Sequence, residues 1–286
     1  NSGFNGTYSA WMPNALDGRD SAFQGDAGIG SDATGRALPY WTRDASGKIA
    51  LQPLVEYDSR ELHPNGVMKG GWFIGPQTNG NESILAPLPY IVQGKSVFLA
   101  TMSVPIMIDG KFAGVAGADF DLAFVQTLAE QVNDSVYGGK GSVAIVSNDG
   151  LVVASSDKPQ VIGGAVGTLD ARIADHMGIL REGKAIVQDD AADNVLRVFS
   201  PVALGRTGQT WSVIITVPRS VVTADADALG TSLANRSADD IFWQVVAALA
   251  IAAIAVMGMG LLAHSISSPI ARLTGEAVAI VAPAAS

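Results

Sequence analysis

The sequence predicts an α+β fold with two tandem antiparallel sheets and covering helices, followed by one transmembrane helix. Three observations lead to this prediction. Strand and turn patterns alternate in two successive regions, each region ends in a helical pattern, and one long apolar run without charge comes near the C-terminal end. The chain has 286 residues, of which 48% are hydrophobic and 16% charged, so it can bury a sizeable core.

The first module is predicted over residues 1–132. A strand is expected at 6–11, and strands alternate with turns from 89 to 118, where Gln-Gly-Lys and Asp-Gly-Lys are typical of hairpins. Residues 70–81 are aromatic and then rich in turn-forming residues. Residues 52–57 are expected to open a short helix, because their proline suits a first helical turn.

A helical pattern that begins at residue 121 leads to the second module, which is predicted over 133–238. Residues 141–156 have the pattern of a strand, an Asp-Gly turn and a strand. Residues 168–182 favour a short helix, and residues 185–218 favour three strands with two turns.

The two modules share an order of elements. Residues 103–122 and 199–221 each read as a strand, a glycine turn, a strand and the start of a helix. Pro105 and Pro201 hold corresponding positions near the first of these strands. We therefore expect a duplicated architecture, in which each module is one antiparallel sheet covered by helices.

An apolar run predicts the transmembrane helix. Residues 245–263 carry no charge, and a helix of about 19 residues is long enough to cross a hydrocarbon core. Phe242 and Trp243 precede the run, where interfacial aromatic residues are expected, so the helix is placed at 241–263. A basic residue follows the run, and positive charge is usually cytoplasmic, so residues 1–240 are expected outside.

The composition disfavours several classes of function. A formal net charge of −9 disfavours nucleic acid as a partner. The absence of cysteine excludes thiolate metal sites, disulfides and cysteine nucleophiles. The histidines His63, His176 and His264 lack metal-ligand spacing, and no serine or lysine has an identifiable activating partner. We therefore expect no enzyme activity, no cofactor and no metal site.

Aromatic residues gather in the first module beside turn-rich segments, where they predict a small-molecule pocket. The alternative for each ring is that it fills a gap in a glycine-rich core. The candidate ligand contacts are the aromatic residues Trp11, Tyr40, Trp41, Tyr57, Trp72, Phe73 and Tyr90, together with Asp119.

Asp119 follows a small apolar stretch and precedes the helical pattern. It could cap that helix, since aspartate is a favoured N-cap residue. Asp121 stands closer to the helical pattern and can take this role. Asp119 is therefore expected to face the pocket, where a carboxylate among aromatic rings suits a cation.

Four stretches, "TYSAWMPNALDGRD", "GRALPYWTR", "GGWFIGP" and "SVPIMIDGKFAGVAGADFDL", resemble the double Cache extracytoplasmic domain of bacterial chemoreceptors. This domain consists of two tandem PAS-like antiparallel sheets. Residues 264–286 resemble the start of a HAMP linker, in which a proline, here Pro269, precedes spaced apolar residues. The family adds an upstream transmembrane helix, a long N-terminal helix and a cytoplasmic signalling tip, so the chain is expected to be a fragment cut at both ends.

The resemblance implies a methyl-accepting chemotaxis receptor of the bacterial inner membrane, with a single span in these residues and a periplasmic or extracellular sensor domain. It implies a homodimer that acts on a cytoplasmic histidine kinase and a coupling protein through the signalling domain. The alternatives are the input region of a sensor histidine kinase or diguanylate cyclase, a sensor that docks a periplasmic binding protein, and a membrane-tethered extracellular enzyme.

The resemblance also implies that Trp72, Tyr90 and Asp119 contact the ligand, with Asp119 gripping an amino group. Two departures from the family pattern narrow the ligand. Gly70 stands where amino-acid-binding members have an arginine for the carboxylate, and Val92 stands where amine-binding members have a second aspartate. We therefore expect neither an α-amino acid nor a diamine, and favour a quaternary ammonium compound, a monoamine or a purine-like ring.

Overall fold

The computed structural model describes residues 3–44, 46–224, 226–232, 241–249, 251, 254, 256 and 257. The chain divides into two compact units, Asn1–Val222 and Thr223–Ser286. Each unit is described by itself below.

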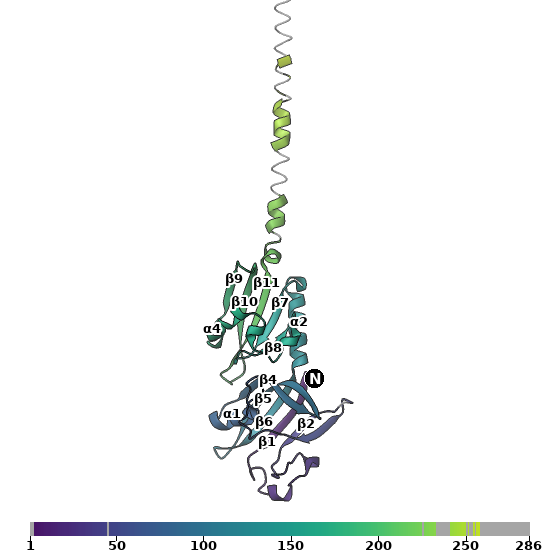
Figure 1. Ribbon diagram of the computed structural model, residues 1–286, viewed down its shortest axis with the longest axis vertical. Helices are drawn as coiled ribbons and strands as arrows, with labels where there is room; N and C mark the ends of the chain where they lie inside the picture. Colours follow the sequence, from purple (N-terminus) through teal and green to yellow (C-terminus); the bar gives the residue numbers. More distant parts are fainter. Residues whose placement is uncertain are drawn as a thin grey trace, which may run out of the picture. The chain divides into compact units, whose positions relative to one another are not determined.

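The first unit contains two antiparallel sheets (Figure 1). The strands of the first module are β1 Phe4–Trp11, β2 Pro39–Arg43, β3 Ile49–Pro53, β4 Ser83–Val92, β5 Lys95–Ile108 and β6 Lys111–Asp121. The strands of the second module are β7 Ser142–Val146, β8 Val152–Ser155, β9 Ile186–Asp190, β10 Val195–Ala203 and β11 Thr210–Pro218. The prediction of an α+β fold with two antiparallel sheets is confirmed.

The strand order repeats between the modules. The first sheet runs β3-β2-β1-β6-β5-β4 and the second runs β8-β7-β11-β10-β9. Without the extra edge strand β3, both follow the order second, first, fifth, fourth, third. Pro105 lies on β5 and Pro201 on the equivalent strand β10, so the expected duplicated architecture is confirmed.

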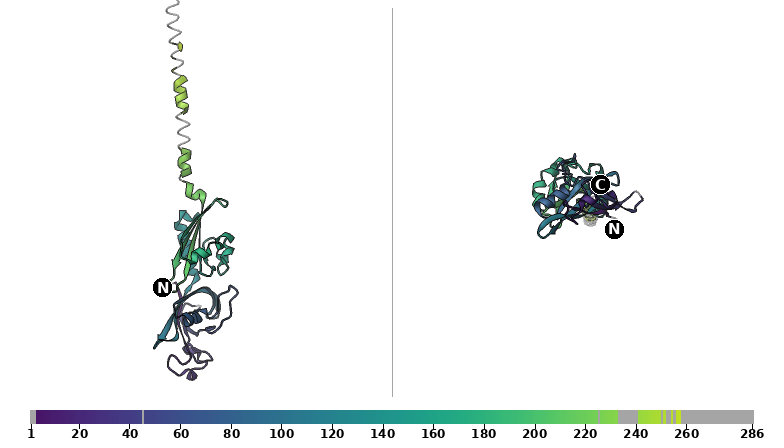
Figure 2. Two further views of the ribbon diagram at one scale, coloured as in Figure 1. Left: turned by 90° about the vertical axis from the view of Figure 1, so that its left-hand side faces the viewer. Right: turned by 90° about the horizontal axis from the view of Figure 1, so that it is seen from below.

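Apart from the helical residues described from 219 onward, the helices are short. They comprise α1 Gly71–Asn79, α2 Leu122–Ser135, α3 Ala171–Ala174 and α4 Met177–Arg181, with 3-10 turns at Asp20–Ala22, Ala27–Ile29, Tyr137–Gly139, Pro159–Val161 and Val166–Thr168. Helix α1 contacts β4, β5 and β6, whereas α2 packs mainly on β7 and β8. The boundary expected between residues 132 and 133 therefore falls inside α2, which connects the two sheets (Figures 1 and 2).

Helix α2 begins where the sequence predicts. Asp121 is its N-cap, and the carboxylate of Asp121 accepts a hydrogen bond from the backbone N–H of Ala123 at 2.9 Å. Strand β6 extends to Asp121, so Asp119 lies within the strand and not at the helix start. The prediction that Asp121 caps the helix is confirmed, and the alternative role of Asp119 as a cap is wrong.

Helix α1 is not predicted by the sequence pattern. It contains Pro76 and ends at Asn79, and its C-cap Gly80 adopts a left-handed conformation with φ 69°. Burial of its side chains, Trp72, Phe73, Ile74 and Pro76, stabilises it against the first sheet. The helix expected at residues 52–57 is wrong, because β3 continues to Pro53 and Glu56 has a φ of +61°, which an α-helix does not allow.

The apolar core has parts within and between the modules. The first module's core surrounds Tyr40, Trp72 and Phe73, and the second module's core surrounds Phe199 and Leu180. A third cluster joins side chains from both sheets: Ile84, Ala86, Ala100, Leu122, Val153 and Trp211. The two modules are therefore in apolar contact.

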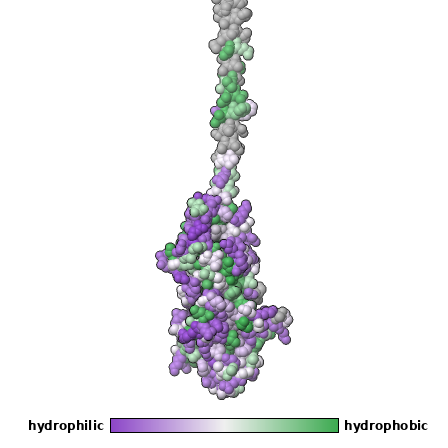
Figure 3. Space-filling model, viewed as in Figure 1, coloured by the Kyte–Doolittle hydropathy of each residue, from purple (hydrophilic) through white to green (hydrophobic). Residues whose placement is uncertain are grey.

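The second unit contains helical residues that carry exposed apolar side chains, as Figure 3 shows for part of 241–257. Within the described part of the chain, no helix is both long and apolar enough to cross a membrane. The predicted span at 241–263 includes residues outside the described ones, and the HAMP-like segment at 264–286 lies entirely outside them.

Candidate ligand-binding site

Strand register brings polar and aromatic side chains together on one face of the first sheet. Tyr8 on β1 pairs with Tyr40 on β2 and with Gly117 on β6. Two residues along β6, Asp119 pairs with Thr101 on β5. Because side chains alternate between the faces of a sheet, these residues share the face that α1 covers.

Asp119 is buried without a partner for one of its oxygens. Asp119 is 3% exposed, and its Oδ1 atom makes no hydrogen bond. Burial raises the pKa of Asp119 to about 6, while the hydroxyl groups of Thr101 and Tyr40 act in the opposite direction. The carboxylate is therefore mostly ionised at neutral pH, and an unpaired buried charge is costly unless a cation or a proton compensates it.

Trp72 contributes a second unpaired group. Trp72 is 2% exposed, and its Nε1 donor is buried without an acceptor. Buried polar groups in folded proteins normally have hydrogen-bond partners. An unpaired acceptor on Asp119 and an unpaired donor on Trp72 beside the same cavity are therefore unusual. The arrangement can receive one molecule that donates to Asp119 and accepts from Trp72.

These groups line a small cavity. Its lining residues are Tyr8, Leu54, Trp72, Leu88, Tyr90, Leu99, Thr101 and Asp119. The cavity volume is about 10 Å³, which is room for about one water molecule. The rings of Tyr8 and Trp72 meet edge to face with centroids 5.2 Å apart, and they help to close the space. A ligand larger than water therefore requires these side chains to move.

The tyrosines of this face are held by hydrogen bonds. The Tyr8 hydroxyl lies 2.7 Å from Oγ1 of Thr101, and the Tyr90 hydroxyl donates to the backbone carbonyl of Val55 at 3.1 Å. The Tyr40 hydroxyl accepts from Nδ2 of Asn5 at 3.2 Å. Burial is the main cause that raises the pKa values of Tyr8, Tyr40 and Tyr90, so these phenols are neutral hydrogen-bonding groups.

Gly117 makes room for Tyr8. A Cβ atom on Gly117 would overlap the Tyr8 ring carbon Cζ and its hydroxyl, and would lie 2.6 Å from the backbone carbonyl of Met102. The ring of Tyr8 can therefore cross β6 only because position 117 has no side chain.

Comparison with known proteins identifies the fold family. Residues 21–226 match the family described as "dCache_1: Cache domain". The chain belongs to the Cache domain family. A Cache domain of this kind is a ligand-binding sensor domain and not an enzyme, so the prediction of no enzyme activity is confirmed.

The curated relatives are chemoreceptors. The chain is 28% identical over 268 residues to methyl-accepting chemotaxis protein TlpQ of Pseudomonas aeruginosa, covering 93% of this chain and 37% of TlpQ. It is 27% identical over 259 residues to methyl-accepting chemotaxis protein McpA of Pseudomonas putida, covering 86% of this chain and 36% of McpA. The chain thus spans well under half the length of these relatives.

Solved structures of sensor domains have the same fold. The extracellular domain of a histidine kinase designated mmHK1S-Z2 is 27% identical, with a TM-score of 0.61 and coverage of 77% of each chain. Methyl-accepting chemotaxis protein X is 23% identical, with a TM-score of 0.56 and coverage of 76% of each chain, which supports the fold alone.

The cavity of this Cache domain gathers some of the predicted contacts. Trp72, Tyr90 and Asp119 line it, and Tyr40 packs beside it, with its ring centroid 5.9 Å from that of Tyr90. The remaining candidates, Trp11, Trp41, Tyr57 and Phe73, lie outside the cavity lining.

The four outlying aromatic residues have other surroundings. Trp41 follows Tyr40 along β2, so it lies on the opposite face, where it is 49% exposed. The Tyr57 hydroxyl donates to Asp32 at 2.5 Å, and the Arg36 guanidinium stacks over the Tyr57 ring at 4.3 Å. Phe73 is a core residue, and the Trp11 indole donates to Ser9 at 3.1 Å.

Several cavity residues were missed by the sequence reasoning. Tyr8 lies two residues from Gly6 and two residues from Ala10 along β1. This period of two places all three on the buried face. Thr101 becomes a cavity residue through its pairing with Asp119, which no local pattern reveals. The apolar residues Leu54, Leu88 and Leu99 complete the lining.

Gly70 lies against backbone carbonyls. A Cβ atom at this position would lie 2.6 Å from the carbonyl oxygens of Glu56 and Tyr57, and 2.8 Å from that of Ser59. An arginine at position 70 could not be accommodated without a shift of the backbone. Lys69 points to other partners, since its ammonium group pairs with Glu61 at 2.8 Å.

Proposed function

We propose that this chain is the sensor region of a bacterial chemoreceptor that binds a small extracytoplasmic ligand in the first module and signals across the membrane in chemotaxis. The observation that carries the proposal is the buried Asp119 carboxylate, which has no partner for Oδ1 inside an aromatic cavity. A ligand cation would supply the missing charge and the missing hydrogen bond.

The proposed ligand is a small cation that also carries a hydrogen-bond acceptor. The cation binds Asp119 and lies against the faces of Tyr8, Trp72 and Tyr90. The acceptor receives the indole N–H of Trp72. A protonated purine-like ring meets both demands, and so does a monoamine that also carries a hydroxyl or carbonyl group. A simple quaternary ammonium compound meets only the demand for charge. Tyr40 is retained as a proposed contact, while packing in the core or on the opposite face is favoured for Trp11, Trp41, Tyr57 and Phe73.

The absence of two further groups narrows the ligand class. Gly70 leaves no space for an arginine clamp, so the carboxylate of an α-amino acid has no bidentate partner there. Val92 is buried in the apolar core, so a diamine lacks a second anchor at that position.

We propose that ligand entry moves helix α1, because Trp72 on this helix closes the cavity. The segment after α1 leads to Glu82, whose carboxylate accepts a hydrogen bond from Nε of Arg206 at 2.8 Å. Arg206 lies in the turn between β10 and β11 of the second module, and β11 leads into the helix at 219–224. We propose that this connection carries the displacement from the first module to the second.

The remaining parts of the proposal concern the longer protein. Residues 241–263 form the membrane span, 264–286 begin a HAMP linker, and the receptor is a homodimer in the inner membrane. The output passes to a cytoplasmic histidine kinase through a coupling protein. The apolar sequence of 245–263 and the similarity to chemotaxis proteins support these steps.

A second candidate is the input region of a sensor histidine kinase. It is favoured by the similarity to the extracellular domain of mmHK1S-Z2. The two candidates share the same ligand site and differ in the output domain.

A thermal-shift screen of the full chain in detergent tests the ligand site. The panel contains monoamines, diamines, quaternary ammonium compounds, purines, amino acids and organic acids. We expect a cationic compound to raise the melting temperature, and Asp119→Asn to weaken its binding at least about tenfold. Asp109→Asn in the exposed β5–β6 turn is the matched control and should bind normally.

Two results would contradict the proposal. One is a panel in which no cation stabilises the chain while a periplasmic binding protein does. The other is a cation whose binding is the same in the Asp119→Asn variant and in the wild type.

A further inference from the structure

The second module contains a cavity that the proposed function does not use. Its volume is about 180 Å³, compared with about 10 Å³ for the cavity beside Asp119. Cavities that bind drug-sized molecules are larger, from about 300 Å³ upward. The size therefore suits a molecule of only a few heavy atoms.

Strand register gives this cavity one polar wall. Ser142 on β7 pairs with Thr216 on β11, which pairs with Arg197 on β10. These three polar residues form one row across the sheet, and all three line the cavity.

The next row and the cover are apolar. Ala144 pairs with Ile214 two residues along the same strands, so both side chains lie on the same face as the polar row. Leu169 and Ile173, from the segment that covers the sheet, also line the cavity. The cavity therefore offers a polar side and an apolar side to one small molecule.

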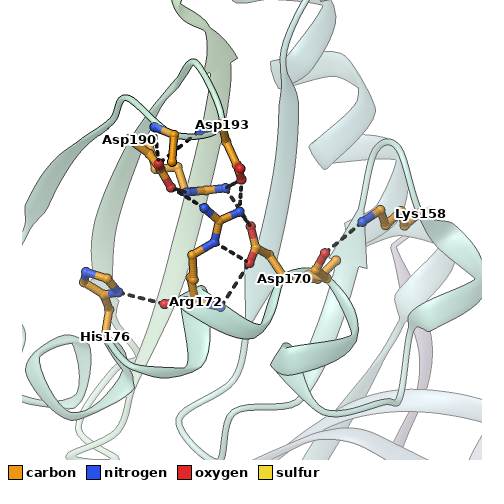
Figure 4. A network of polar contacts seen from close by, with 9 residues as sticks. Lys158, Asp170, Arg172, His176, Asp190 and Asp193 are labelled. Carbon is orange, nitrogen blue, oxygen red and sulfur yellow. Dashed lines mark hydrogen bonds and ion pairs between the residues drawn. The ribbon is translucent and has the colours of Figure 1, made fainter.

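Arg197 and Asp170, two charged groups of the wall, are already neutralised by ion pairs. Figure 4 shows the contact of Asp170 with the neighbouring Arg172. The guanidinium of Arg197 donates to Asp190 at 2.7 Å and to Asp170 at 2.6 Å. Asp170 also accepts the backbone N–H of Arg172 at 3.0 Å and pairs with the Arg172 side chain. Arg197 and Asp170 shape the wall but have little capacity left for a ligand.

Lys158 retains capacity for a ligand. Its ammonium donates to the backbone carbonyl of Leu169 at 2.8 Å, which uses one of its three N–H groups (Figure 4). Ser142 and Thr216 also line the cavity, and a hydroxyl group can donate one hydrogen bond. Asp157, the other charged lining residue, is exposed at the rim, where water screens its carboxylate.

We propose that this cavity binds a small monocarboxylate. The carboxylate accepts hydrogen bonds from the Lys158 ammonium and from the hydroxyls of Ser142 and Thr216. A short aliphatic tail lies against Ala144, Ile214 and the apolar cover. This second site is independent of Asp119, and the chain then responds to two ligands of opposite charge.

Titration calorimetry of the full chain in detergent tests the second site, with sodium acetate, propionate and butyrate as probes and sodium chloride at matched ionic strength. Lys158→Gln keeps an N–H donor for Leu169 but removes the charge, and we expect it to weaken carboxylate binding at least about tenfold. Ala144→Leu should block binding by filling the cavity. Lys184→Gln is the matched control, because Lys184 is exposed and pairs with Glu182 at 2.8 Å in the same module.

Selective binding of a carboxylate that both cavity variants weaken supports the proposal. It is overturned if no carboxylate binds, if Lys158→Gln and Ala144→Leu bind normally, or if propylammonium binds this cavity in place of propionate. Asp119→Asn should leave carboxylate binding unchanged, so failure of the second site and failure of the first can be told apart.

Discussion

Thr101 and Asp119 face each other across β5 and β6, and the Thr101 hydroxyl lies 2.7 Å from the Tyr8 hydroxyl. The pairing brings three polar side chains under helix α1. It still leaves Oδ1 of Asp119 without a hydrogen bond. The buried carboxylate is thus held in place by the sheet, and its charge is left for a ligand to compensate.

The titration of Asp119 predicts how stability depends on pH. Its pKa in the folded protein is about 6, above the ordinary value of 3.8. The folded protein therefore binds this proton more tightly than the unfolded chain does. The protonated Asp119 therefore stabilises the folded state. This contribution to the free energy of unfolding is fully present below about pH 4 and is lost as the pH rises through about 6, a change of about 3 kcal/mol.

Urea denaturation of wild type and Asp119→Asn from pH 4 to pH 7 measures this effect. Other carboxylates titrate in both proteins and cancel in the difference. The stability of the variant relative to wild type should increase by about 2–3 kcal/mol over this range, because at pH 4 the carboxyl group is already partly ionised in the unfolded chain. A difference that stays constant with pH would show that the carboxyl group is not desolvated. Asp109→Asn controls for the loss of a surface charge.

Removing the space above β6 should destabilise the first module. In Gly117→Ala the new methyl group overlaps the ring of Tyr8, so the ring or the strand must shift. We expect a loss of about 1–3 kcal/mol in the free energy of unfolding, together with weaker ligand binding. Gly178→Ala is the matched control, since it lies in α4 with nothing within 4 Å of the new atom, and it should be neutral or slightly stabilising. Equal stability of the two variants would contradict the crowding argument.

Position 70 should not accept the arginine that amino-acid-binding relatives are expected to have. Gly70→Arg and Gly70→Ala both place a Cβ atom against the carbonyls of Glu56, Tyr57 and Ser59. We expect both variants to melt at lower temperature, and Gly70→Arg not to bind amino acids. Calorimetry with an amino-acid panel checks this, and a folded Gly70→Arg that binds an amino acid would refute it.

The ion pair between Glu82 and Arg206 should matter for transmission more than for stability. Arg206 is largely exposed, and exposed ion pairs contribute at most about 1 kcal/mol. Arg206→Ala should therefore change the melting temperature little and leave ligand affinity unchanged. It should reduce the ligand-induced change in hydrogen exchange at 219–224.

Hydrogen exchange followed by mass spectrometry measures that change with and without ligand. Arg19→Ala, which removes an exposed pair with Asp17 in the first module, is the control. An undiminished response at 219–224 in Arg206→Ala would exclude this route of transmission.

Much of the fold followed from local patterns in the sequence. The hairpins, the repeated order of strands and the cap at Asp121 depend on turn chemistry, on side-chain alternation and on a hydrogen bond that spans two residues. These are short-range effects, so the residues that cause them are neighbours in the chain. Helix α1 was missed because its glycines and Pro76 oppose helix formation locally, and burial of Trp72 and Phe73 outweighs that preference.

The sequence by itself determined that Asp119 is free from capping and that aromatic residues gather in the first module. Tertiary structure decided which aromatic residues share a cavity with it. Tyr8, Trp72 and Tyr90 meet Asp119, whereas Trp41 lies on the opposite face, because strand register and the covering helix set these distances over tens of residues of chain. The cavity of the second module has the same origin. Ser142 and Thr216 are far apart in the chain and become neighbours only through the pairing of β7 with β11.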